Sequence, residues 1–255
     1  MGSLAIARLS VVETLRRKEF YVVLVLVLGL AGWMLMLNLG SSGAGRFAKD
    51  IVMQAIWLAS FALAVPLAAR QISSDVEQKT VYVLMSRPIH RWHYVVGRAL
   101  GASAASIVCF ASMFAVLVIM LLAKGAGSIA DMGLWQAFIL QIAALVMLCS
   151  LAVCISVVAT PGGAVTFSLI LLLVTRYGSA SILSRIEHMP AVARETAWAV
   201  YIALPHFEFF NISQRVVHGW GALPADIFLQ SLVYGFVCSV FFTTLAAVIF
   251  RKRWL

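Results

Sequence analysis

Six long apolar runs limit what this chain can fold into more than any other feature of its sequence. Each comes close to the roughly twenty apolar residues that an α-helix needs to cross the hydrocarbon core of a bilayer. Only helices and closed barrels satisfy their backbone hydrogen bonds in lipid, and runs of this length fit helices. The sequence therefore predicts an all-α integral membrane protein, with a single transmembrane domain over residues 1–255 and six transmembrane helices. The runs cover residues 20–38, 51–69, 99–123, 134–158, 161–183 and 227–250.

Composition supports a membrane protein and argues against a nucleic-acid partner. Hydrophobic residues make up 63% of the chain, against roughly 45–50% in an ordinary soluble domain. The net charge of +9 would suit nucleic acid, but the basic residues gather at the ends of the apolar runs and form no stripe with interleaved aromatic residues. All four cysteines lie inside apolar runs. We therefore expect them to be core residues, and we expect no metal site.

Lysine and arginine are unevenly shared between the two sides of the predicted membrane. Four lie before the first run, five in the connector of residues 70–98 and three at the C-terminus, while the whole of the other side holds seven. Because cytoplasmic loops carry the excess of basic residues, both termini are expected in the cytoplasm, with the chain in an inner or plasma membrane. Residues 3–19 suit an amphipathic helix lying flat on the inner surface, although an ordinary charged flank of the first span also fits.

The connector of residues 70–98 is the most charged connector in the chain. Ile72, Val76, Val83 and Leu84 recur near helical spacing with polar residues on the other side, which predicts a short amphipathic helix that ends around Ser86. Pro88 ends this helix, because proline has no amide proton to donate and restricts the residue before it. A helix of this kind at a membrane surface has two uses: it rests on lipid, or a soluble partner binds it.

Two features of the adjoining spans concern packing. Gly97, Gly101 and Ala105 recur at four-residue intervals, and such a stripe of small residues lets helix backbones approach closely, within one chain or between two. Pro66 lies inside the second apolar run, where it marks either a hinge or a packing kink.

Residues 184–226 form a long, semi-apolar connection on the outer side. Residues 197–210 are too few to cross the membrane and are interrupted by Pro205, which predicts a re-entrant or interfacial helical pair. A short soluble cap and a seventh span are the alternatives. Arg176, late in the fifth run, either extends to the membrane surface or pairs with Glu187 or Glu208 and so holds this outer hairpin.

Enzymatic chemistry has little support in the sequence. No loop of the form G-x-x-x-x-G-K-[ST] occurs, so we do not expect the chain to bind ATP in that manner. A membrane hydrolase would need a nucleophile and a base within reach of each other. Ser179, Ser181 and His218 are of the right types, but neither serine lies in a G-x-S-x-G turn. We therefore expect no catalytic residue in this chain.

The connector also follows a pattern known from one family. The residues that carry the pattern are Asp75, Glu77, Thr80, Leu84, Ser86, Pro88, Ile89, Arg91, Gly97 and Arg98. They resemble the segment E-x-E-x-G-T-x-x-x-L-L-S-x-P-[IV]-S-R, followed by a Gly-[KR] pair, that ABC-2-type permease subunits carry between spans 2 and 3. These permeases also form the membrane half of type V ABC exporters. Lys79 stands in place of the family's glycine and His90 in place of its serine.

A second stretch is similar to one branch of that family. Residues 204–207, Leu-Pro-His-Phe, with Phe210 and Asn211, resemble a signature of the branch that includes the nitrous-oxide reductase maturation permease.

The resemblance implies a fold, partners and contacts. The fold has an N-terminal interfacial helix, six spans, a cytoplasmic coupling helix between spans 2 and 3, and an outer re-entrant hairpin before span 6. Two permease copies, as a homodimer or with a close paralogue, pair with two ABC ATPase subunits. ATP and Mg²⁺ bind in the ATPase, and this chain holds no cofactor. The implied ATPase contacts on the coupling helix are Asp75, Glu77, Gln78, Lys79, Thr80, Leu84, Arg87 and Pro88.

The implied function is that of the permease subunit of an ATP-driven exporter. A membrane scaffold or assembly factor without a transport cycle is the alternative from another class. An intramembrane hydrolase is the third interpretation.

Overall fold

The computed structural model describes residues 21–22, 25–29, 32–33, 42–77, 91–124, 131–175, 194–196, 198, 201 and 204–253. Regular secondary structure within these residues is entirely helical, which confirms the predicted all-α class. The longer helices are α3 (Ser42–Ala69), α6 (Arg91–Lys124), α7 (Met132–Val158), α8 (Pro161–Leu173) and α12 (Ala225–Arg253). The shorter ones are α4 (Gln71–Glu77), the 3-10 helix η2 (Phe207–Phe210) and α11 (Ser213–His218).

Four of the described helices, α3, α6, α7 and α12, are long and apolar enough to cross a membrane, and α8 is a shorter apolar helix. The chain is therefore a multi-pass membrane protein. Parts of the first predicted span are helical, at residues 21–22, 25–29 and 32–33, and α8 covers the beginning of the fifth. The count of six spans stays a prediction, and the interfacial helix of residues 3–19 lies outside the described residues.

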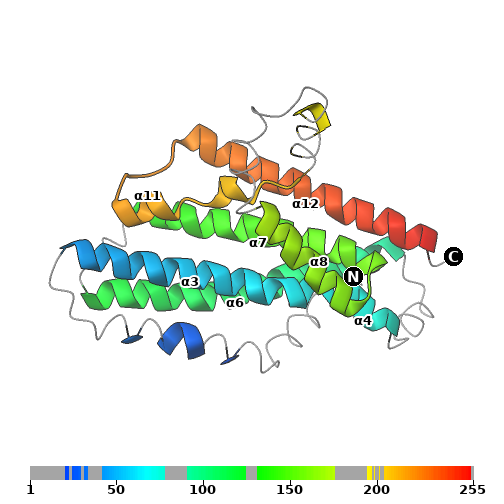
Figure 1. The fold of residues 1–255 in the computed structure, drawn as a ribbon, viewed down its shortest axis with the longest axis horizontal. Coiled ribbons are helices and arrows are strands. Elements are labelled where there is room, and N and C mark those ends of the chain that lie inside the picture. Colours follow the sequence, from blue (N-terminus) through cyan, green and yellow to red (C-terminus); the bar gives the residue numbers. More distant parts are fainter. Residues whose placement is uncertain are drawn as a thin grey trace.

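Helix α7 lies at the centre of the bundle. It packs against α3, α6 and α8, and α12 runs along it (Figure 1). Its ends follow local rules. The Asp131 side chain accepts a hydrogen bond from the amide of Gly133 at 3.2 Å and so caps the start of α7. After α7, Thr160 caps α8 and Pro161 occupies its first turn, where a missing amide proton costs nothing.

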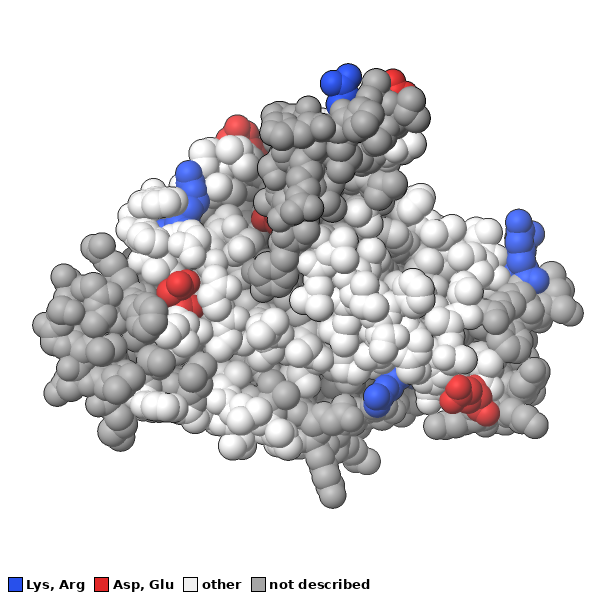
Figure 2. Space-filling view, in the orientation of Figure 1, with Lys and Arg blue, Asp and Glu red and all other residues white. Residues whose placement is uncertain are grey.

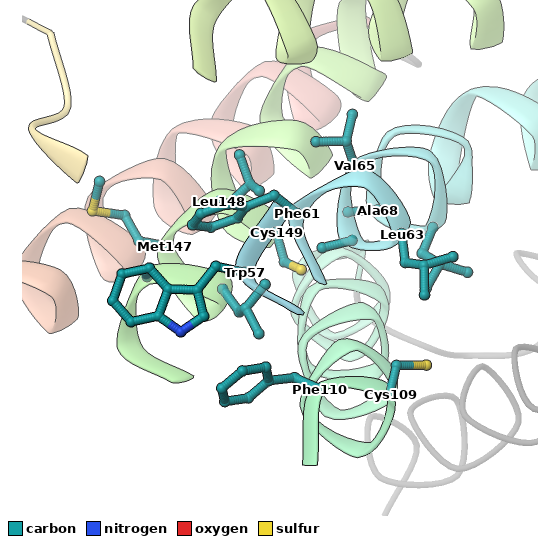
Figure 3. Packing of buried hydrophobic residues seen from close by; sticks show 14 of the residues in the cluster. Trp57, Phe61, Leu63, Val65, Ala68, Cys109, Phe110, Met147, Leu148 and Cys149 are labelled. Carbon is teal, nitrogen blue, oxygen red and sulfur yellow. The ribbon is translucent and has the colours of Figure 1, made fainter. Parts of the chain in front are cut away.

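The hydrophobic core forms where α3, α6 and α7 meet (Figure 3). Trp57 and Phe61 of α3 join Phe110 of α6 and Leu148 of α7 in one buried cluster. Helix α12 is different, because only 17% of its most apolar stretch is buried, against 67% for α7. Most of its apolar surface therefore faces outwards, as expected of a membrane span at the edge of a bundle.

The surface charge agrees with a membrane environment. In the view of Figure 2, most of the charged side chains that are drawn lie towards the edges, and most of the described surface between them is uncharged. A largely uncharged surface between charged ends is what the hydrocarbon core of a bilayer requires.

Three segments share one end of the bundle: α4, the turn between α7 and α8, and the end of α12 (Figure 1). The rings of Tyr94, near the start of α6, and Phe250, near the end of α12, lie 5.6 Å apart. Helix α6 begins at Arg91, so the last eight residues of the predicted connector form its first turns. The basic connector and the basic C-terminus therefore meet at the same end of the molecule.

At the opposite end, η2 and α11 fold against α3 and α7. Gln136 of α7 forms two hydrogen bonds with the backbone of Leu223, as donor at 3.1 Å and as acceptor at 2.7 Å. Gln54 of α3 donates to the hydroxyl of Ser213 at 3.1 Å. Positive φ angles at Gly219 and Gly221 then turn the chain into α12. The re-entrant depth of the outer region stays a prediction, because residues 184–193 lie outside the described part.

Candidate functional site

Helix α4 follows α3 after a short interruption of the helical hydrogen bonds, and a helix bends at such an interruption. Helix α3 ends at Ala69, Arg70 forms a turn, and α4 begins at Gln71. The amide of Arg70 still donates to the carbonyl of Pro66 at 3.3 Å, and that of Ser74 to the carbonyl of Arg70 at 3.1 Å. The bend therefore lies one turn after Pro66, and α3 itself continues through the proline.

An ion pair joins α4 to α6. The carboxylate of Asp75 accepts hydrogen bonds from the guanidinium of Arg98 and, at 2.5 Å, from the hydroxyl of Tyr94. A second guanidinium nitrogen of Arg98 donates to the side-chain oxygen of Gln71 at 2.9 Å. The two charged side chains are only 10% and 15% exposed. Charged groups this far from water require such partners, so the network fixes α4 against α6.

A hydroxyl joins α4 to α7. The oxygen of Ser156 accepts hydrogen bonds from the backbone amides of Ile72 and Ser73, at 3.2 and 3.0 Å. Ile72 is fully buried, and Ser73 and Ser156 are nearly so. Helix α4 is thus held by α6 through charge and by α7 through a serine, while it follows α3 directly in sequence.

An open hollow of about 140 Å³ lies between α4 and the turn from α7 to α8. One wall is Ser73, Val76 and Glu77, and the other runs from Ser156 to Pro161. The side chain of Glu77 is exposed at the end of α4. A partner that approached this end of the molecule would meet one carboxylate beside a small, partly apolar depression.

The predicted coupling residues divide into two groups. Asp75 turns its carboxylate to α6, and Glu77 faces solvent. The other six lie outside the described residues: Gln78, Lys79, Thr80, Leu84, Arg87 and Pro88. Contact of any of the eight with an ATPase stays a prediction.

The small-residue stripe is inside the chain. Gly97, Gly101 and Ala105 are all buried in α6, which packs against α3, α7 and α12. Next to Ala105, the hydroxyl of Ser106 contacts the sulfur of Cys149 at 3.4 Å. Close packing within one chain therefore accounts for the burial of the stripe.

The predicted outer residues are also partly described. Pro205 is buried and Glu208 half-buried, whereas Arg176 and Glu187 lie outside the described residues. His206 lies in a cluster of aromatic rings, 4.5 Å from Tyr201 and stacked at 5.5 Å on Phe209. Its amide donates to the Tyr234 hydroxyl at 2.9 Å. Burial lowers the pKa of His206, and the charge of Glu208 acts in the opposite direction.

Metal binding finds no support in the part of the chain that the structure describes. No three histidine, cysteine, aspartate or glutamate side chains come together there in a way that could hold an ion.

Sequence reasoning missed the partners that hold α4. Arg98 belongs to the family pattern and lies next to an apolar run, where a charge indicates a partner or the membrane surface, but the sequence does not show that the partner is Asp75. Tyr94 and Ser156 gave no signal of their own, because a tyrosine near a helix start and a serine in an apolar run are common.

Comparison with known protein families decides the identity of the chain. Residues 4–253 match the model of the ABC-2 family transporter protein. The chain belongs to the ABC-2 transporter family. The match spans nearly the whole chain and does not separate the branches of the family, so the nitrous-oxide reductase branch is not confirmed. No curated protein matches the chain.

Membership of the ABC-2 family fits the helical bundle described above. The chain is a permease, the membrane-spanning subunit of an ABC exporter, and permeases of this family typically pair with an ABC ATPase.

Proposed function

We propose that this permease couples ATP hydrolysis by a separate ATPase subunit to the movement of a substrate across or out of the membrane. The observation that carries the proposal is the attachment of α4. This short helix follows one span directly and is bonded to two others by Asp75, Arg98 and Ser156. A push on a helix held in this way moves several spans together, which is what a coupling element must do.

The proposed assembly contains two permease copies, identical or closely paralogous, and two ATPase subunits. ATP and Mg²⁺ bind in the ATPases, and this chain performs no hydrolysis itself. Both termini face the cytoplasm, which puts α4, the turn from α7 to α8 and the end of α12 on the side where ATP is present.

The first steps of the proposed cycle are supported by contacts of the described residues. An ATPase subunit binds α4 at Glu77 and at the adjoining hollow. Closure of the ATPases on ATP displaces α4, and the buried ion pair of Asp75 and Arg98 transmits this displacement to α6. The displacement of spans in both copies opens a path for substrate between the two copies. When the ATPases open again, the helices return to their first positions.

Co-purification tests the proposal. The tagged permease is expressed with the ATPase encoded beside it and extracted in mild detergent, and the ATPase that it retains is measured. We expect the wild-type chain to retain the ATPase. We expect Glu77→Arg to weaken the complex by roughly tenfold or more, because reversal of an interface charge opposes the partner's complementary charge.

Asp226→Arg is the matched control, because Asp226 is an exposed carboxylate in the first turn of α12 at the other end of the bundle. It should bind the ATPase as the wild-type chain does. A wild-type permease that never retains the ATPase would contradict the proposed function and leave the scaffold interpretation in its place.

A further inference from the structure

The bend between α3 and α4 breaks the regular hydrogen bonding of a helix. In an uninterrupted α-helix each amide donates to the carbonyl four residues earlier, so Ile72 would bond to residue 68 and Ser73 to Ala69. Here both amides donate to the hydroxyl oxygen of Ser156, at 3.2 and 3.0 Å. The carbonyl of Ala69 accepts instead from the side-chain hydroxyl of Ser73 at 3.0 Å.

These bonds matter because the amides of Ile72 and Ser73 are buried. Ile72 is fully buried, and Ser73 and Ser156 are 5% and 2% exposed. Buried amides without an acceptor are costly. The two amides therefore have two satisfied arrangements: bonded to Ser156 with the chain bent, or bonded to their own helix with α3 and α4 in line.

We propose that Ser156 acts as a releasable cap that sets the direction of α4. In the bent state, α7 supplies the acceptor for the amides of Ile72 and Ser73. When the cap is released, residues 69–73 complete the helix and α4 swings into line with α3. The role of this cap in transport rests on the function proposed above. In that function, the movement of the coupling helix is this exchange of hydrogen bonds.

The surroundings of Ser156 suit such an exchange. The hydroxyl also donates to the hydroxyl of Ser73 at 3.3 Å, so the two serines form one chain of bonds across the bend. Both serines line the hollow beside α4, and a polar side chain that entered the hollow would compete for them.

Pulsed electron paramagnetic resonance on the purified permease, without any ATPase, tests the cap. Spin labels are placed at Ala62→Cys in α3 and Glu77→Cys in α4, both exposed, in a background with the four native cysteines replaced by alanine. Fifteen residues of unbroken helix span roughly 22 Å. We expect Ser156→Ala to shift the population roughly tenfold towards that longer separation, because the bent state loses its acceptor.

Two variants serve as controls. Ser156→Thr keeps the hydroxyl and should retain the wild-type distance distribution. Ser150→Ala removes another buried hydroxyl of α7, which donates only to the carbonyl of Val146 at 2.9 Å, and should leave the distribution unchanged.

Ser73→Ala supplies an independent variant if Ser156→Ala does not fold. It leaves the carbonyl of Ala69 without a hydrogen-bond donor in the bent state, so it should shift the distances between the spin labels in the same direction. A wild-type distribution in Ser156→Ala, or an equal shift in Ser150→Ala, overturns the proposal. Because the ATPase is absent, this result is independent of the co-purification that tests the proposed function.

Discussion

Arg98 is a charged residue whose effect depends on one buried partner. Its guanidinium and the carboxylate of Asp75 are 10% and 15% exposed, and loss of one member leaves the other poorly solvated. Breaking a fully buried pair costs about 3–5 kcal/mol, and partial exposure reduces this to about 2 kcal/mol. We expect Arg98→Met to lower the Tm in detergent by roughly 4–8 °C, measured by tryptophan fluorescence on heating.

Arg251→Met removes an exposed basic residue at the same end of the molecule and should leave the Tm within about 1 °C. The double variant Arg98→Met with Asp75→Asn removes both charges and should recover part of the Tm that Arg98→Met loses. If the double variant is no more stable than Arg98→Met alone, then an unpaired charge is not the cause.

The chain needs a glycine at position 235 of α12 because the ring of Phe210 lies close to its backbone. A Cβ at this position would lie 3.0 Å from two ring carbons of Phe210 and 3.6 Å from the Cβ of Ala143. Phe210 is buried, so its ring has little room to move. We expect Gly235→Val to lower stability by about 1–3 kcal/mol, seen as a lower Tm.

The same substitution at Gly162, where no atom lies within 4 Å of a Cβ, separates overpacking from the general effect of valine in a helix. Shortening the obstructing ring with Phe210→Leu should restore part of the stability of Gly235→Val. An unchanged Tm in Gly235→Val would show that η2 moves aside freely.

At the scale of elements, the outer segment of residues 204–212 is held by the aromatic cluster around His206, which gives it a pH dependence. Burial lowers the pKa of His206, so the folded segment favours the neutral ring and the unfolded chain binds a proton more readily. The stabilisation is complete above the unfolded pKa of about 6.5 and is lost as the pH falls below it. We expect the wild-type Tm to drop more between pH 8 and pH 5.5 than that of His206→Gln.

His218→Gln is the control, since His218 is exposed on α11 and should keep the wild-type drop. If the Tm of His206→Gln and that of the wild-type chain drop equally between pH 8 and pH 5.5, the pH dependence belongs to other groups.

Local signals explain which elements could be predicted. The end of α7 at Val158 agrees with the predicted span, because Thr160 and Pro161 mark it in the sequence. The start of α6 could not be found by counting apolar residues, since its first turns carry Arg91, Trp92 and Arg98 and lie beyond the apolar run. The bend before α4 depends on Ser156, more than eighty residues further along the chain, so no local pattern could reveal it.

At the scale of the whole molecule, family and class could be predicted and the arrangement of helices could not. Six apolar runs and the pattern from Asp75 to Arg98 indicated a membrane permease, and the family match agrees. Helices α7 and α12 are both strongly apolar, yet α7 is central and α12 is largely exposed. Composition does not distinguish a span that faces other helices from one that faces lipid, because both environments are apolar.

The two ends of the bundle carry exposed positions at which the topology of the chain can be tested. Glu77 and Lys252 are exposed at the end that carries α4, and Trp220 and Asp226 at the end that carries α11. Single cysteines at these positions, with the four native cysteines replaced by alanine, are treated in intact cells with a maleimide that cannot cross the membrane. Because basic residues favour the cytoplasmic side, label should reach positions 220 and 226 at once, and positions 77 and 252 only after permeabilisation.

Label at positions 77 and 252 alone in intact cells would reverse the predicted orientation, but it would still place the two ends of the bundle on opposite sides of the membrane. Label at 77 and 220 together in intact cells would contradict the arrangement itself, because a bundle that spans the bilayer cannot present both ends of α3 and α7 to the same side.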